Sequence, residues 1–155
     1  MKQRGNKHKG CEGEFFAMFD AISKGYIVAQ NIESDLLGYD FILDDGEQLF
    51  RVEVKTSEFT VPSKTTGKAD NNKVNFSLTS QTGSGYINKY NHIEWVALFA
   101  PRFQKVAWIK KKDIGSKKVL YEKDFEHLQL PENEKLKYLT EISEEFDDKQ
   151  VNLFD

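Results

Sequence analysis

The feature that most constrains the fold of this chain is the alternation of apolar and charged residues in the stretch 49–56, LFRVEVKT. Successive side chains of a strand point to opposite faces, so Glu53 and Lys55 share one face. The apolar residues on the other face are Phe50, Val52 and Val54. The stretch therefore predicts a strand that packs one side under a helix and presents a carboxylate beside an ammonium on its other side.

A second strand is predicted at 39–44, just before an Asp-Gly pair that is typical of a two-residue hairpin turn. With Asp45-Gly46 as that turn, Asp40 lies opposite Arg51. Asp40 is then a diagonal neighbour of Glu53 on the same face, roughly 7–8 Å away at the backbone. A register slip of one residue would move Asp40 to the opposite face, so the pairing decides whether the two carboxylates can meet.

The residues before these strands predict a helix over 12–24, because apolar side chains recur at i, i+3, i+4 and i+7. These apolar residues are Phe15, Met18, Phe19 and Ile22. Gly25 is expected to end the helix in the left-handed conformation that favours glycine.

Further strands are predicted at 26–31, 75–79, 95–100 and 105–110, the last two joined as a hairpin. The polar stretch 60–73 contains Pro, Gly and Asn without periodicity and predicts a mobile loop. This order of elements predicts an α/β or α+β fold with a central mixed sheet flanked by helices. We expect one domain over 1–131, followed at 132–155 by a C-terminal helix (134–146) and an acidic tail.

Composition excludes several classes of protein. With 155 residues, 39% of them hydrophobic, the chain can close one core, and no apolar run is long enough to span a bilayer. No signal-type segment follows the basic N-terminus, so a cytoplasmic protein is expected. Cys11 is the single cysteine, and the three histidines have no metal-ligand spacing with it, which argues against a disulfide or structural zinc.

The net charge of −3 conceals an uneven distribution. Residues 132–155 hold eight acidic residues and three lysines, so the part of the chain before them is net positive. Two basic clusters lie in that part and are candidates for contacting DNA phosphates, although solvated surface is the alternative. The candidate DNA-binding residues are Lys7, Lys9, Arg102, Lys110, Lys111 and Lys112.

Two carboxylates beside a lysine suit phosphodiester hydrolysis. Asp40 and Glu53 repel each other unless a divalent cation lies between them, and Mg²⁺ prefers such oxygen ligands together with water and substrate phosphate. The cation would lower the pKa of a bound water, and Lys55 would orient or deprotonate that water and stabilise the charge that develops on phosphorus. The alternative is an ordinary half-exposed strand.

These pieces together resemble the PD-(D/E)xK nuclease superfamily, in particular its small homing endonuclease and Holliday junction resolvase-like members. The matching segments are KGCEGE at 9–14, KGYIV at 24–28, GYDFI at 38–42 and RVEVKT at 51–56, with a weaker match at 93–99. The chain departs from the common pattern by having Gly-Tyr-Asp in place of Pro-Asp.

The resemblance implies a restriction-endonuclease-like core and roles for four residues. It implies that Asp40, Glu53 and Glu14 bind Mg²⁺, for which Mn²⁺ can substitute, and that Lys55 is the catalytic lysine. The choice of Glu14 over Glu12 rests on the resemblance alone, because both border the apolar face of the helix.

The C-terminal segment QVNLF at 150–154 resembles the short peptide by which bacterial replication and repair proteins bind the β sliding clamp. Gln150, Leu153 and Phe154 would then be the partner-binding residues, since such a peptide needs a flexible tail and apolar anchors. The alternative is that these side chains fold back on the domain or pair with another subunit.

The sequence thus predicts a magnesium-dependent DNA endonuclease, acting as a homodimer or tetramer, encoded by a bacterium or its phage and involved in DNA recombination or repair. Branched DNA such as a Holliday junction is the favoured substrate, because 155 residues leave little room for an added specificity domain. A sequence-specific homing or restriction-type endonuclease is the alternative. A non-catalytic DNA-binding or clamp-associated protein is the rival from another class.

Overall fold

The computed structural model describes residues 6–31, 38–78, 80–82, 85–87, 92–115 and 117–136. Its centre is a five-stranded sheet in the order β1-β2-β3-β9-β10. The strands are β1 (Ile27–Gln30), β2 (Phe41–Asp44), β3 (Leu49–Thr56), β9 (Trp95–Ala100) and β10 (Lys105–Lys110). β3 and β9 run parallel and the other neighbours run antiparallel, which confirms the predicted mixed sheet.

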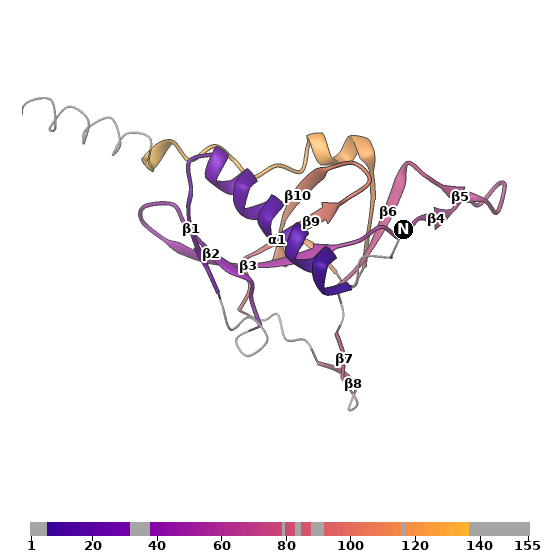
Figure 1. The fold of residues 1–155 in the computed structure, drawn as a ribbon, viewed down its shortest axis with the longest axis horizontal. Coiled ribbons are helices and arrows are strands. Elements are labelled where there is room, and N and C mark those ends of the chain that lie inside the picture. Colours follow the sequence, from indigo (N-terminus) through magenta and orange to yellow (C-terminus); the bar gives the residue numbers. More distant parts are fainter. Residues whose placement is uncertain are drawn as a thin grey trace, which may run out of the picture.

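Helix α1 (Asn6–Ser23) lies across one face of this sheet (Figure 1). It ends as predicted, because Gly25 has a φ of 87° and the amides of Gly25 and Tyr26 donate to the carbonyls of Ile22 and Ala21. Asp20 anchors the helix to β10 by accepting a 2.7 Å hydrogen bond from the indole of Trp108. The helix is therefore held firmly over the sheet.

The face of α1 that contacts the sheet differs from the prediction. Of the four predicted apolar residues only Met18 is buried, whereas Phe15, Phe19 and Ile22 are 59%, 73% and 56% exposed. The buried face is formed by small residues, Gly13, Ala17 and Ala21, together with Met18. Small side chains let the helix approach the sheet closely. The helix therefore packs through its small residues and not through the larger apolar residues that the periodicity predicted.

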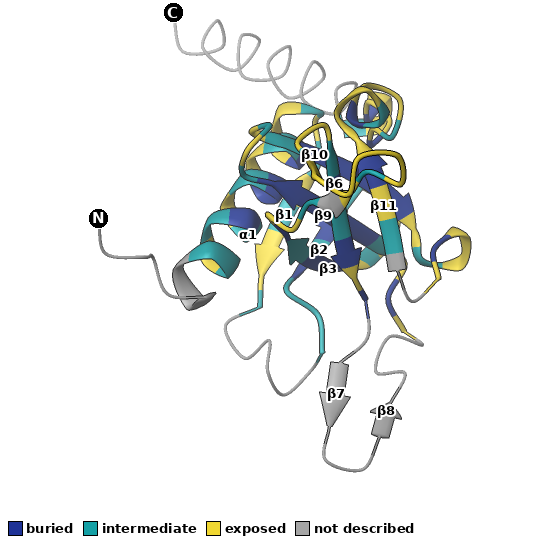
Figure 2. Ribbon diagram, turned by 90° about the vertical axis from the view of Figure 1, so that its right-hand side faces the viewer, coloured by how far each residue is buried: buried dark blue, intermediate teal, exposed yellow. Residues whose placement is uncertain are grey.

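Apolar residues of β3 complete the core under the helix. Val52 and Val54 pack in one cluster with Ala17, Met18 and Ala21, and Phe50 packs against its edge, as predicted. The opposite face of the sheet is covered by a two-stranded sheet, β6 (Lys73–Ser77) with β11 (Lys117–Tyr121), and by the 3₁₀ helix η2 (Glu122–Glu126). Buried residues concentrate in β9 and β10 between these layers (Figure 2).

The β2–β3 hairpin has a different register from the one predicted. Phe41 pairs with Val52 and Asp44 with Leu49, which leaves a four-residue loop, 45–48, closed by a hydrogen bond from the amide of Asp45 to the carbonyl of Gln48. The carboxylate of Asp45 also accepts the amides of residues 47 and 48, which stabilises the longer loop. The prediction was wrong by two residues, and a shift of two leaves every side chain on its predicted face.

The stretch 60–73, predicted to be a loop without strands, contains the short ribbon of β4 (Val61–Pro62) and β5 (Ala69–Asp70). Two-residue strands are too short to show periodicity, which is why the residue pattern predicts no strand there. A second ribbon, β7 (Ser80–Thr82) with β8 (Gly85–Ile87), was not predicted either. Both ribbons extend away from the central sheet (Figure 1).

Two further predictions concern the ends of the chain. Residues 134–136 are helical, in agreement with the start of the predicted C-terminal helix, and residues 137–155 lie outside the described residues. The clamp-type segment with Gln150, Leu153 and Phe154 is among them. In the described part of the chain, no helix has the length and apolar character to cross a membrane.

Candidate active site

Strand β3 places Glu53 and Lys55 on one face, where Lys55 Nζ forms an ion pair with Glu53 Oε1. Glu53 is 9% exposed, so this carboxylate is almost as buried as the core. Its parallel neighbour on β9 is Val96, and Lys55 lies beside Leu98 in the same way. A charged pair therefore occupies a position on the sheet that the adjacent strand fills with apolar side chains.

Burial raises the pKa of Glu53 from 4.5 to about 7, because the carboxylate loses hydration among apolar neighbours. The positive charge of Lys55 opposes this and lowers the pKa, whereas the negative charges of Asp40 and Glu14 raise it. Three carboxylates and one ammonium thus interact electrostatically at this point of the sheet. A group that titrates near neutral pH is characteristic of sites that bind metal ions or move protons.

Asp40 reaches the same point of β3 from the segment before β2. Its amide donates to the carbonyl of Val52 (2.8 Å), and its Oδ2 accepts the amide of Val54 (2.6 Å). Asn31 supports this segment, since its amide and its side chain donate to the carbonyls of Asp40 and Tyr39 at 2.9 Å each. The backbone on both sides of Glu53 therefore fixes the position of Asp40.

Helix α1 brings Glu14 to the site through the glycine before it. A Cβ atom on Gly13 would lie 2.0 Å from Oγ1 of Thr56, so only glycine allows the helix to approach β3 this closely. Thr56 directly follows Lys55 in the strand. The close approach therefore brings the part of α1 that carries Glu14 against the end of β3.

Glu14 is linked to the pair on β3 by electrostatics. The charge of Glu14 contributes to the raised pKa of Glu53. The structure therefore brings Glu14 together with Asp40, Glu53 and Lys55, the four residues that the sequence singled out.

These carboxylates do not converge as a set of three ligands. Within the described ranges, no group of three or more acidic, histidine or cysteine side chains has the arrangement of a metal site. Asp40 Oδ2 is directed at the amide of Val54, and Glu53 Oε1 at Lys55. Asp40 and Glu53 nevertheless provide carboxylate oxygens whose charges repel each other, which suits a hard divalent cation that takes its remaining ligands from water and phosphate.

The predicted DNA-binding residues are dispersed. Lys9 forms an ion pair with Glu58, and the guanidinium of exposed Arg102 donates to the carbonyl of Asn71. The side chain of Lys7 lies outside the described part.

The three consecutive lysines also separate. Lys110 Nζ lies 5.6 Å from the ring centroid of Trp95, and Lys112 is exposed. Lys111 lines a small pocket, about 10 Å³ in volume, together with Glu53, Lys55, Leu78 and Val96. The sequence signalled Lys111 as part of a basic run, but not its position beside the charged pair.

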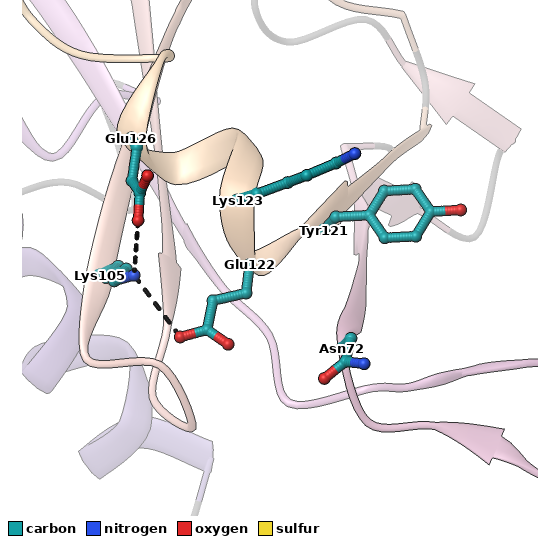
Figure 3. Close-up of a pocket in the computed structure, with 6 residues that line it drawn as sticks. All are labelled: Asn72, Lys105, Tyr121, Glu122, Lys123 and Glu126. Atoms are coloured by element: carbon teal, nitrogen blue, oxygen red, sulfur yellow. Dashed lines mark hydrogen bonds and ion pairs between the residues drawn. The ribbon is translucent and has the colours of Figure 1, made fainter.

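A larger, open hollow of about 460 Å³ lies elsewhere on the surface (Figure 3). In it Lys105 interacts with Glu122 (3.5 Å) and Glu126 (3.6 Å), and all three are exposed or nearly so. None of the four candidate catalytic residues lines this hollow. Its charges are neutralised in a solvated surface network, so size alone does not identify the reactive site.

Comparisons with known proteins bear on the family and the fold of the chain. A family model described as PD-(D/E)XK endonuclease matches residues 4–137. No curated protein sequence matches the chain significantly.

Two solved structures resemble the fold. One is the bacterial homing endonuclease I-Ssp6803I, with a TM-score of 0.56 and 21% identity, covering 76% of this chain and 78% of that one. The other is Hjc, a Holliday junction resolvase of the archaeal hyperthermophile Archaeoglobus fulgidus, with a TM-score of 0.48 and 14% identity, covering 83% of this chain and 95% of that one.

Proposed function

The chain belongs to the PD-(D/E)XK endonuclease family, and we propose that it is a magnesium-dependent DNA endonuclease whose hydrolytic centre is Glu14, Asp40, Glu53 and Lys55. The observation that carries this proposal is the buried Glu53, paired with Lys55 beside Asp40, at strand positions where the neighbouring strand β9 carries the buried apolar residues Val96 and Leu98. Burying an ion pair contributes little to stability, so a functional reason for its presence is favoured.

Endonucleases of this family typically use a divalent metal ion, and the donor set here fits one. Asp40 and Glu53 would hold Mg²⁺, with Glu14 completing the set directly or through a water, and Mn²⁺ is expected to substitute. When bound, the cation supplies positive charge that polarises the phosphate and lowers the pKa of a water. Positive charge bound there would favour the ionised form of Glu53, against the burial and the repulsion that raise its pKa.

The residues of the chain then have distinct tasks. Lys55 orients the attacking water and stabilises negative charge on the phosphate oxygens in the transition state. Asp40, Glu53 and Glu14 would hold the cation that neutralises charge on the phosphate. Water oxygen adds to phosphorus and the P–O3′ bond breaks, leaving a 5′-phosphate and a 3′-hydroxyl on the DNA.

Two candidate functions differ in the DNA substrate that the protein would cut. Branched DNA is the first, since the described domain is little more than the nuclease core. The second, a sequence-specific homing or restriction-type endonuclease, is favoured by the β4–β5 ribbon, which extends from the sheet and carries the exposed lysines Lys64 and Lys68 (Figure 1). A two-stranded ribbon can enter the major groove, where base edges are distinguishable.

One experiment tests the activity and separates the two substrates. The protein is incubated with Mg²⁺ and linear, nicked, flapped and four-way DNA, together with a linear library of random sequence. Cleavage confined to the four-way junction supports the first candidate, and recurrent cut sites in the library support the second. DNA binding without cleavage of any substrate would favour the rival, a non-catalytic DNA-binding protein.

We also propose that the protein forms a homodimer or tetramer through α1. Phe15, Phe19 and Ile22 form an exposed apolar stripe on one side of the helix, and patches of this kind usually mark interfaces. In a symmetric dimer the same stripe faces its own copy. Sedimentation of Phe19→Ser should show a smaller species than wild type, while Leu49→Ser, an equally exposed apolar change elsewhere, should not. Identical sedimentation of all three would reject this interface.

Finally, the tail with Gln150, Leu153 and Phe154 is proposed to bind a bacterial sliding clamp, on the sequence motif alone. Removing residues 150–155 should abolish clamp binding, measured by surface plasmon resonance, and leave the melting temperature and cleavage rate unchanged. A truncated protein with a lowered melting temperature would instead indicate that these side chains are part of the fold.

A further inference from the structure

We propose that Lys111 is a second cationic side chain of the active site, contacting a non-bridging oxygen of the DNA phosphate that is cut; this inference rests on the proposed function. Lys111 is half-buried and lines the small pocket that also contains Glu53 and Lys55. Three side chains that border one small space can reach the same phosphate group, whose oxygens accept from an ammonium donor.

Backbone hydrogen bonds connect Lys111 to strand β3, which carries Glu53 and Lys55. Its amide donates to the carbonyl of Glu94 (2.9 Å), and the amide of Glu94 donates to the carbonyl of Arg51 (3.1 Å). The side chain of Glu94 accepts the amide of Arg51 as well (2.6 Å). Arg51 precedes Glu53 by two residues, so a continuous chain of hydrogen bonds ties Lys111 to β3.

The following residues restrain Lys111 from the other side. It begins the 3₁₀ helix η1 (Lys111–Asp113), and its carbonyl accepts the amide of Ile114 (3.3 Å), whose side chain is buried in the core. Lys110 and Lys112 lack this placement, because one lies over Trp95 and the other is exposed.

Within the described part of the chain, no acidic group is paired with the charge of Lys111. Lys55 is paired with Glu53, whereas the Lys111 ammonium forms no hydrogen bond or ion pair with any described residue. Since the neighbouring carboxylate of Glu53 is already paired with Lys55, the half-buried ammonium of Lys111 favours binding of a further anion. The phosphate gains negative charge on its non-bridging oxygens during hydrolysis, so a cation fixed at this point stabilises the transition state more than the ground state.

The test compares Lys111→Met with Lys105→Met, two changes that each remove one charge and preserve the length of the side chain; Lys105 lies in an exposed ion pair outside the site. Single-turnover cleavage is measured with Mg²⁺, and DNA affinity is measured with Ca²⁺. Lys111→Met should lower the cleavage rate about 100-fold and change affinity less than about 3-fold, whereas Lys105→Met should leave the rate unchanged. Lys111→Arg should recover part of the rate. Equal cleavage rates for Lys111→Met and wild type would overturn the proposal.

A second readout does not depend on cleavage. The ¹⁵N resonance of the Lys111 ammonium should shift and become protected from exchange when a DNA duplex is added with Ca²⁺, and that of Lys105 should change little. If wild type cuts no DNA but Lys111 responds in this way, the proposed function fails and the phosphate contact stands. If the resonance of Lys111 does not respond to DNA, the contact is rejected whether or not the protein cleaves.

Discussion

Strands β3 and β9 lie side by side and run parallel, yet they use the same face of the sheet in opposite ways. On β9 that face carries Val96 and Leu98, which are buried in a core cluster. On β3 it carries Glu53 and Lys55 at the positions paired with them. Apolar side chains at these points gain stability from burial, whereas the charged pair loses hydration. The proposed active site therefore lies where burial of a charged pair costs stability.

The largest effect is expected when the chemistry of β3 is removed. Lys55→Ala and Asp40→Asn should each lower the single-turnover cleavage rate by about 1000-fold or more and leave DNA binding largely intact, because they remove charge stabilisation and metal affinity. Lys105→Ala, a change in an exposed ion pair outside the site, is the control. Wild-type rates in either β3-site mutant would mean that the site is assigned wrongly.

The helix contribution is tested by a matched pair of changes. Glu14→Gln should reduce cleavage about 100-fold, since it removes a charge that acts on Glu53, while Glu12→Gln should have little effect. Both changes keep the size of the side chain and the helix. If Glu12→Gln is the inactivating change, the family alignment is displaced by two residues.

The charged pair also predicts an unusual dependence of stability on pH. The folded state raises the pKa of Glu53 from 4.5 to about 7, so the folded protein retains its proton where the unfolded chain has released it. In the absence of divalent metal, this group should make the free energy of unfolding fall between pH 4.5 and 7, by about 3 kcal/mol in total. Below pH 4.5 both states are protonated and the penalty disappears.

Glu53→Gln removes this titration, so its stability should change less over the same interval and exceed that of wild type at pH 8. Urea unfolding in EDTA measures both curves. Added Mg²⁺ should stabilise wild type more at pH 8 than at pH 6, because the proton competes with the cation. Parallel curves for the two proteins would show that Glu53 titrates normally.

Replacing two glycines of α1 by alanine should have smaller effects, and these effects on stability should be opposite in sign. Gly13→Ala would place a methyl group against Thr56 and should destabilise the protein by about 1–3 kcal/mol and slow cleavage by displacing Glu14. At Gly10 nothing lies within 4 Å of an added Cβ, so Gly10→Ala should stabilise the helix by about 0.5–1 kcal/mol. Thermal unfolding distinguishes them, and equal effects would contradict the close approach.

The smallest expected effect concerns the lysine run after β10. Changing Lys110, Lys111 and Lys112 together to Gln should flatten the dependence of DNA affinity on salt concentration, by about 0.9 in slope for each phosphate that these lysines neutralise in the wild type. Fluorescence anisotropy over a salt series measures this slope. An unchanged slope would mean that these lysines are solvated surface and do not neutralise DNA phosphates.

Prediction from sequence succeeded where local pattern decides structure. The bounds of β3, β9 and β10 and the glycine cap of α1 were predicted correctly. The hairpin register was predicted with an error of two residues, because the hydrogen bonds of Asp45 that lengthen the loop are not visible in an Asp-Gly pair. The site geometry tolerated this error, since strand faces repeat every two residues.

What the sequence determined by itself is the alternation that places Glu53 beside Lys55 and the order of motifs that identifies the family. Only the tertiary structure decided which side of α1 meets the sheet, because an approach close enough to exclude a Cβ at Gly13 depends on Thr56, a residue 43 positions away. The tertiary structure also brought Lys111 beside the Glu53–Lys55 pair, because backbone hydrogen bonds link β3 to the end of β10. Periodicity along a chain defines faces, but contacts between distant segments define which faces meet.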